Sequence, residues 1–179
     1  MSLLLWTTEI KWSLSMPDDK QNYSRVIPVW KFALFSIASL GLYQMYWNYK
    51  SWKFLKEKDN LEVSPFWRAF FMPIFMSSLF DKFSDMLKAE GRQTNYPTPF
   101  LIFIWMILNT VCPYAEGPLL LLIYLSFIAF IPVLNSLNVY WSEMSPELPE
   151  KPLTGWQITL LIIGIVFFSI ILLGTFLLS

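Results

Sequence analysis

Histidine is absent from this sequence of 179 residues, and cysteine occurs once, at Cys112. The lack of histidine removes the commonest general base and the commonest imidazole metal ligand. A single cysteine cannot form a disulfide within the chain. Charged residues are also scarce, at 15% against roughly 25% in average soluble proteins. These absences argue against histidine-dependent catalysis, and we expect a protein without a cofactor, without a metal site and without catalytic residues.

The thirteen basic and thirteen acidic side chains cancel, so no net field points to nucleic acid. What the sequence does contain is apolar: 55% of the residues are hydrophobic and 18% are aromatic. A soluble fold of this length has too little interior to bury that much apolar surface. The composition therefore predicts an integral membrane protein, with the lipid bilayer as its first partner.

A helix needs about 20 apolar residues to cross the hydrocarbon core of a bilayer. Five stretches compete for this role: Val29–Trp47, Pro65–Phe80, Phe100–Cys112, Leu119–Leu137 and Trp156–Leu178. We expect an all-α, polytopic helical membrane protein with about four transmembrane helices and one re-entrant or interfacial amphipathic helix. Residues 29–178 would form a single transmembrane domain after a polar tail at residues 1–28. Residues 1–15 are open to a second interpretation, as an artefact of an upstream start, because Met16 opens a more ordinary polar lead-in.

The second stretch is expected to dip into the membrane without crossing it. Pro73 should kink this helix. Beyond the kink, residues 75–90 alternate apolar and charged faces at helical spacing. Basic residues flank the stretch on both sides, and the positive-inside bias places both groups in the cytoplasm only if the stretch does not cross. These basic residues are Lys50, Lys53, Lys56, Lys58, Lys82, Lys88 and Arg92.

The side of the N-terminus stays open at this point. If Val29–Trp47 crosses as one helix, Lys11, Lys20 and Arg25 face the outside, against the same bias. Gly41 could instead break this stretch into a hairpin and leave the N-terminus in the cytoplasm.

Residues 41–53 combine Tyr, Trp and Lys, which favour the boundary between membrane and water. The side chains expected to anchor the protein at this boundary are Tyr43, Tyr46, Trp47, Tyr49, Lys50 and Trp52. Lipid headgroups, anionic ones in particular, are expected to contact Lys53, Arg68, Lys82 and Lys88.

The run Gly41-Leu42-Tyr43-Gln44-Met45-Tyr46-Trp47-Asn48-Tyr49-Lys50 resembles a Gly-[Ile/Leu]-Tyr-x-x-Tyr-Trp-x-Tyr-Lys motif. This motif comes after the first apolar helix in a family of small multi-pass inner-membrane proteins of bacteria that have no assigned activity. Residues 64–71 are similar to the segment downstream of the motif in such proteins. The resemblance covers roughly residues 29–80 and implies a bacterial inner-membrane location without implying a function.

Three functions remain open. The first is a membrane-embedded interaction or envelope-accessory protein, which works with another membrane protein through its basic and aromatic cytoplasmic region. The second is a small permease or channel, which would need a water-accessible path along Asn109, Ser126 and Ser169. The third is a lipid-modifying enzyme, which would need Arg68 and the carboxylates of Asp81 and Asp85 in one cleft.

Overall fold

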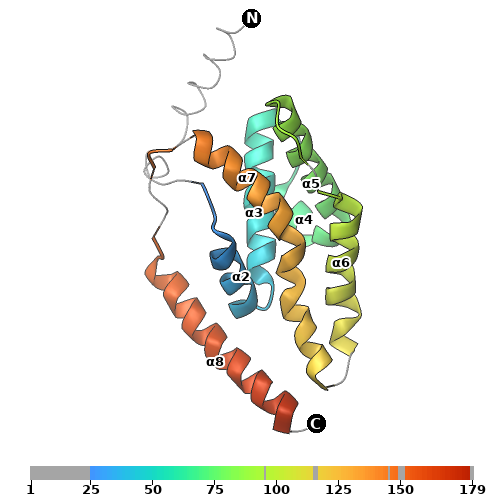
Figure 1. Cartoon of the computed structure of the whole chain (residues 1–179), viewed down its shortest axis with the longest axis vertical. Coiled ribbons are helices and arrows are strands. Elements are labelled where there is room, and N and C mark those ends of the chain that lie inside the picture. The colour runs from blue at the N-terminus through green and yellow to red at the C-terminus, as the bar shows by residue number, and fades with distance from the viewer. Residues whose placement is uncertain (1–24, 95, 115–116, 145, 149–151, 178–179) are drawn as a thin grey trace, which may run out of the picture.

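The computed structural model describes residues 25–94, 96–114, 117–144, 146–148 and 152–177. Over these residues every regular element is helical, and no strand occurs. Figure 1 shows most of the helices running along one common axis, with α8 inclined across the lower part of the bundle. The all-α fold class expected from the sequence is confirmed, while the tail at residues 1–24 lies outside the described residues.

The first apolar stretch is a helical hairpin and not one long helix. Helix α2 covers Val29–Ala38 and helix α3 covers Leu42–Asp59. Between them Gly41 has a φ of 86°, a left-handed conformation that costs glycine little. The Gly41 N–H donates to the carbonyl of Ser36 at 2.8 Å, and the Tyr43 N–H donates to the Ser39 hydroxyl at 2.8 Å. The stretch is therefore not one long helix, and the break lies at Gly41 as the hairpin alternative expected. The side of the membrane on which the N-terminus lies stays a prediction.

The second apolar stretch is also divided. Helix α4 covers Pro65–Phe70 and helix α5 covers Met72–Ala89, with the break at Phe71. Pro73 lies in the first turn of α5, where its missing N–H removes no helical hydrogen bond. Gly91, with a φ of 74°, follows the end of α5.

The apolar face of α5 packs inside the protein. Its fully buried side chains include Met76, Leu79, Phe80 and Leu87, and α5 contacts α3, α6 and α7. The expectation that this amphipathic helix lies in the membrane interface is corrected accordingly, because its apolar face is covered by neighbouring helices.

The third and fourth stretches form an antiparallel pair. Helix α6 covers Thr98–Thr110, a short 3-10 turn η2 covers Cys112–Tyr114, and a 3-10 helix η3 covers Gly117–Phe130. Helix α7, Ile131–Met144, continues directly from η3. A 3-10 helix rises about 2.0 Å per residue, so η3 alone extends about 28 Å, close to the thickness of a hydrocarbon core.

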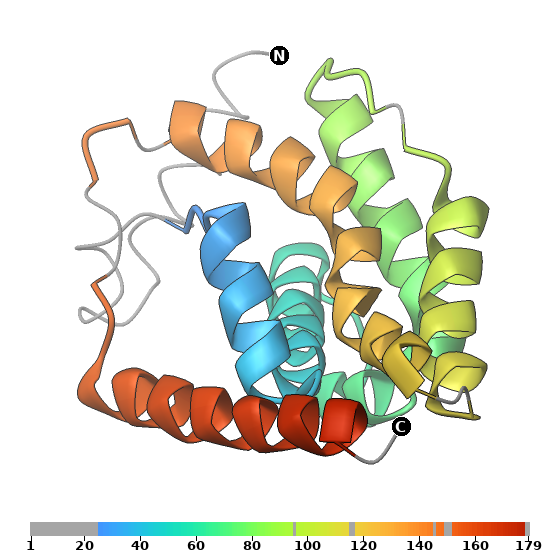
Figure 2. The same ribbon diagram turned by 60° about the horizontal axis from the view of Figure 1, so that its bottom comes forward.

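Helix α8 covers Gly155–Leu177 and lies on the outside of the bundle. Figure 2 shows it crossing the end of α2 near the turn into α3. Most of its described side chains are exposed, among them Ile162, Ile163, Val166 and Phe167. Two segments of the described chain have the length and composition needed to cross a membrane, Leu121–Met144 and Gln157–Gly174, whereas α2 and Thr98–Tyr114 are apolar but shorter.

Aromatic rings fill the centre of the bundle. The ring of Phe130 is fully buried, and its centroid lies 5.4 Å from that of Phe32, 5.6 Å from Trp47 and 5.6 Å from Phe80. The contacts with Trp47 and Phe80 are edge-to-face, an arrangement that stabilises a core beyond the area that it buries. Phe130 therefore joins η3 to α2, α3 and α5 at one point.

Candidate functional site: a charged end and a polar interior

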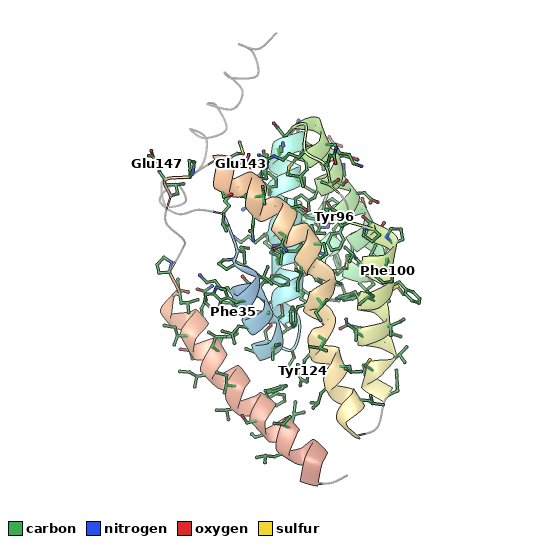
Figure 3. All side chains as sticks on the ribbon, viewed as in Figure 1. Phe35, Tyr96, Phe100, Tyr124, Glu143 and Glu147 are labelled. Carbon is green, nitrogen blue, oxygen red and sulfur yellow. The ribbon has the colours of Figure 1, made fainter. Side chains whose placement is uncertain are left out.

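Charged side chains gather at one end of the bundle. Helices α3, α5 and α7 all finish at this end, at the top of Figure 1, and Figure 3 shows Glu143 and Glu147 there. We call this surface the charged end: Lys53, Lys56, Glu57, Lys58 and Asp59 of α3; Asp81, Lys82, Asp85 and Lys88 of α5; and Glu90, Arg92, Glu143 and Glu147. At the opposite end lie the turn from α2 to α3 and the turn from α6 to η3. Among the described residues, the charges are thus concentrated toward one end of the bundle axis.

Several of these charges are engaged with α7. Arg92 donates two hydrogen bonds to the carboxylate of Glu143, and its guanidinium lies 5.5 Å from the ring centroid of Tyr140. The Lys58 ammonium lies 5.9 Å from the same ring. Within α3, Lys53 pairs with Glu57 at 3.9 Å. These contacts tie the ends of α3, α5 and α7 together.

Residues 25–28 lie against the same end of the bundle. The amide side chain of Asn138 accepts a hydrogen bond from the Ile27 N–H at 2.9 Å and donates one to the Ile27 carbonyl at 2.8 Å. The Arg25 guanidinium lies 4.9 Å from the ring centroid of Trp141. Burial lowers the pKa of Arg25, and the nearby Glu57 carboxylate opposes that shift. The segment before α2 is therefore part of the folded unit.

The six predicted boundary anchors occupy different environments. Trp47 and Trp52 are buried in the core, so these two side chains serve packing. Tyr46 is exposed, and the Lys50 ammonium lies 5.7 Å from its ring. Tyr43 and Tyr49 are half-buried. Anchoring by Tyr43, Tyr46, Tyr49 and Lys50 stays a prediction.

The four predicted headgroup contacts also differ. Lys88 is exposed, and Lys53, Arg68 and Lys82 are half-buried. The Arg68 guanidinium lies 4.2 Å from the ring centroid of Trp52 and 5.2 Å from that of Phe75. Within the described chain no hydrogen bond or ion pair joins Arg68 to a carboxylate. Asp85 is exposed, and Asp81 is exposed and accepts a hydrogen bond from the Ser77 hydroxyl.

A polar stripe runs along the buried face of α3. Gln44, Asn48 and Trp52 follow one another at four-residue spacing, which places them on one side of the helix. All three are buried. The two polar side-chain atoms of Asn48 and the indole nitrogen of Trp52 have no hydrogen-bond partner in the part of the chain that the structure describes. Buried polar groups of this kind normally bind ordered water, an ion or a ligand.

At one end of this stripe the hydrogen bonds have a fixed direction. The Trp105 indole donates to the carbonyl oxygen of Gln44 at 2.9 Å, and an indole nitrogen can only donate. The amide nitrogen of Gln44 then donates to the hydroxyl of Ser126 at 2.9 Å. Ser126 accepts this bond, so its own proton remains available to an acceptor.

Ser126 also lines a cavity of about 220 Å³. The lining residues come from α2 and its turn, from α6, from η3 and from α8: Ser36, Leu40, Gly41, Asn109, Ile123, Tyr124, Ser126 and Ile171. The Ser36 hydroxyl is buried and has no partner among the described residues. Asn109 donates to the Trp105 carbonyl at 2.9 Å, which leaves its own carbonyl oxygen as an acceptor. None of the described residues that line the cavity is charged.

Only two of the three residues expected along a permeation path meet at this cavity. Asn109 and Ser126 line it, but the hydroxyl of Ser169 is exposed and donates to the Ile165 carbonyl within α8.

The sequence analysis missed Gln44, Asn48 and Trp105. The four-residue spacing of Gln44, Asn48 and Trp52 within an aromatic string was the signal that could have revealed the stripe. Among the described residues no three His, Cys, Asp or Glu side chains group as metal ligands.

Comparison of this chain with known protein families, with characterised proteins and with solved structures finds no match.

Proposed function

We propose that this chain is a multi-pass protein of the bacterial inner membrane that works as a membrane-embedded interaction or accessory protein. Its working surface is the charged end, which faces the cytoplasm. The observation that carries this proposal is the segregation of charge along the bundle axis (Figure 3). The resemblance of residues 41–50 to small inner-membrane proteins supports the location.

The exposed apolar surface supports the membrane setting. Helix α8 exposes a row of large aliphatic and aromatic side chains, and α6 exposes Phe100 and Phe103. Helix α4 adds Phe66, Trp67 and Phe70 at the surface, where Phe66 stacks on Phe70 and Trp67 meets Phe70 edge to face. Soluble monomers rarely expose contiguous apolar patches of this extent, and lipid would cover them. The charged end would then be the part of the protein that water and partners can reach.

The character of the charged end favours a protein partner over a purely electrostatic lipid site. Basic and acidic side chains alternate there, and Asp81 and Asp85 stand beside Lys82 and Lys88 on α5. Interspersed charges give little net attraction to an anionic surface, but they can match a partner with complementary charges in a fixed register. We therefore propose protein binding as the main role, with anionic lipid as the competing outcome of the test.

The alternatives receive less support from the geometry. A permease would need the cavity to continue through the bundle, but its Ser126 is engaged by Gln44, which in turn accepts from Trp105. A lipid-modifying enzyme would need Arg68 near Asp81 or Asp85, and no interaction joins them within the described residues. Binding is the function that remains.

Photo-crosslinking in the cell tests this proposal. A photoreactive phenylalanine analogue would replace Lys56 or Lys88 at the charged end, and Tyr114 at the opposite end. All three side chains are exposed, so Tyr114 is a matched control. We expect discrete protein adducts at residues 56 and 88, and none at residue 114.

Adducts of the same proteins at all three positions would contradict the proposal, since the charged end would then have no special role. Adducts of phospholipid alone at residues 56 and 88 would replace the protein partner with anionic lipid. The absence of any adduct at the charged end would also overturn the proposal.

A further inference from the structure

The cavity beside the turn from α2 to α3 has a chemical character that the charged end does not share. Its polar groups are two hydroxyls and one amide oxygen, contributed by Ser36, Ser126 and Asn109. The rest of its wall is apolar, apart from the Tyr124 side chain and the backbone of Gly41. We propose that this cavity binds a small, uncharged, lipid-soluble molecule with one polar end, of the size and type of a medium-chain alcohol.

The hydrogen-bonding groups define what the polar end of this molecule must offer. The Ser126 oxygen accepts a hydrogen bond from Gln44, and no hydrogen bond found among the described residues uses the Ser126 proton. The Ser36 hydroxyl can both donate and accept. The Asn109 carbonyl oxygen accepts. An alcohol supplies a donor and an acceptor on one atom, and therefore satisfies Ser36 or Ser126 together with Asn109.

The absence of charge among the lining residues and the size of the cavity further restrict the class of molecule that it can bind. A bare ion would have to lose its hydration shell in a cavity without a charged partner, which costs far more than burying a neutral group. An engineered apolar cavity of about 150 Å³ binds benzene. The cavity here, at about 220 Å³, therefore accommodates roughly eight to ten non-hydrogen atoms.

The apolar lining explains how such a molecule would reach the site. Leu40 is exposed and Ile171 is half-buried, so the cavity meets the apolar outer surface between the hairpin and α8. Figure 3 shows Tyr124 on the side of η3 that faces α8. Entry from lipid rests on the proposed membrane setting, but it does not depend on the role of the charged end.

The experiment uses the full chain in nanodiscs of phosphatidylethanolamine and phosphatidylglycerol, with a diazirine derivative of 1-octanol as the photoreactive probe. Peptide mass spectrometry would compare labelling of Ile123, Tyr124 and Ile171 with labelling of Ile163, which is exposed on α8. We expect excess 1-octanol to reduce labelling at the cavity about fivefold or more, and n-octane at the same bilayer concentration to reduce it less than about twofold.

A variant pair tests the polar contact directly. Ser36→Ala removes the unpartnered hydroxyl and should weaken labelling of the cavity about two- to tenfold, the effect of one neutral hydrogen bond. Ser169→Ala, on the outer face of α8, is the matched control and should label as the wild type does. Ser36→Thr keeps a hydroxyl and should restore labelling.

Three results would overturn the proposal. Labelling of Ile163 as strong as that of the cavity residues would mean that the probe only partitions into lipid. Equal competition by octane and octanol would mean that the polar groups contribute nothing. Equal labelling of Ser36→Ala and wild type would have the same meaning. The competition by octanol and octane uses the wild-type chain, so it tests whether the cavity binds an alcohol even if Ser36→Ala does not fold. None of these three results bears on crosslinking at the charged end, so the two proposals fail separately.

Discussion

The aromatic centre of the bundle and helix α8 are equally apolar, yet they relate to the rest of the protein in opposite ways. Phe130 and its neighbours Phe32, Trp47 and Phe80 are covered on every side by other helices. Helix α8 has only Leu161 and Gly164 buried among its described residues. It is held mainly where Gly164 meets Ala38 and where the Phe168 and Tyr124 rings touch, with centroids 4.9 Å apart.

This difference shows that apolar composition alone does not define a core. The aromatic centre supplies its own solvent-free surroundings, so its packing should persist in any medium that keeps the protein folded. The outer face of α8 has no protein cover and, on the proposed arrangement, depends on lipid. Changes at the centre should therefore destabilise the whole bundle, and changes at the α8 contact should act locally.

The largest effect is expected from Phe130→Ala. Removal of a buried phenylalanine ring typically costs about 3–5 kcal/mol, because the cavity that it leaves is only partly filled by relaxation. Reversible unfolding in mild detergent would measure the change in the free energy of unfolding. Phe103→Ala is the matched control, since this ring is 60% exposed on α6. Equal losses from both variants would abolish the distinction between the centre and the surface.

The contact between α8 and α2 is tested by Gly164→Ala. A Cβ atom at residue 164 would collide with the backbone of Ala38, so α8 would have to move outward. We expect a loss of about 1–3 kcal/mol. Gly174→Ala is the control, because nothing lies near its Cβ position and both changes give the same gain in helix propensity. Hydrogen exchange should show the change in α8 and α2 while α5 stays protected; a uniform change would contradict a local attachment.

Loss of the two hydrogen bonds between Asn138 and Ile27 should have an effect of similar size. Asn138→Ala removes both hydrogen bonds to the backbone of Ile27, for about 1–3 kcal/mol in total. Proteolysis before α2 should become faster in this variant. Asn135→Ala lies on the exposed side of the same helix and should behave as the wild type does. If Asn135→Ala is cleaved as fast as Asn138→Ala, the hydrogen bonds from Asn138 are not what holds the segment before α2 in place.

The smallest effect concerns Tyr96, whose hydroxyl donates to the Phe80 carbonyl at 3.1 Å. Burial raises its pKa to about 12, against an opposing contribution from Ser84. The folded protein keeps this proton after the unfolded chain has lost it. The stability from this group is therefore full below pH 10 and is lost as the pH rises from 10 to 12. Tyr96→Phe should lose about 0.5–1.5 kcal/mol at neutral pH and should show a shallower alkaline decline; an unchanged slope would exclude Tyr96 as a source of that decline.

How much of this fold the sequence predicts depends on the kind of signal. Pro73 predicted an interruption of the second stretch, and Gly41 allowed one in the first without deciding it, because both residues act on the local backbone. The amphipathic pattern of residues 75–90 predicted a helix with one apolar face, but periodicity does not tell whether protein or lipid covers that face. Here α6 and α7 cover it.

The candidate site was harder to predict for the same reason. The basic residues were expected on one side of the membrane, and this stays a prediction. The structure shows only that α3 and α5 finish at the same end of the bundle. The buried polar stripe was missed because Gln44 and Asn48 sit among aromatic residues that suggested a membrane boundary. Their role depends on Trp105 and Ser126, which are far away in sequence.

The proposed role of the charged end depends on how the bundle is oriented in the membrane, and cysteine labelling measures that orientation. Single cysteines would replace Lys56, Lys88 or Tyr114 in a Cys112→Ser background, and a membrane-impermeant thiol reagent would be added to intact cells and to inverted vesicles. We expect residues 56 and 88 to react only in inverted vesicles, and residue 114, which is 86% exposed, to react only in intact cells. Labelling of residues 56 and 88 from opposite sides, or of residue 114 from the same side as both, would contradict this orientation.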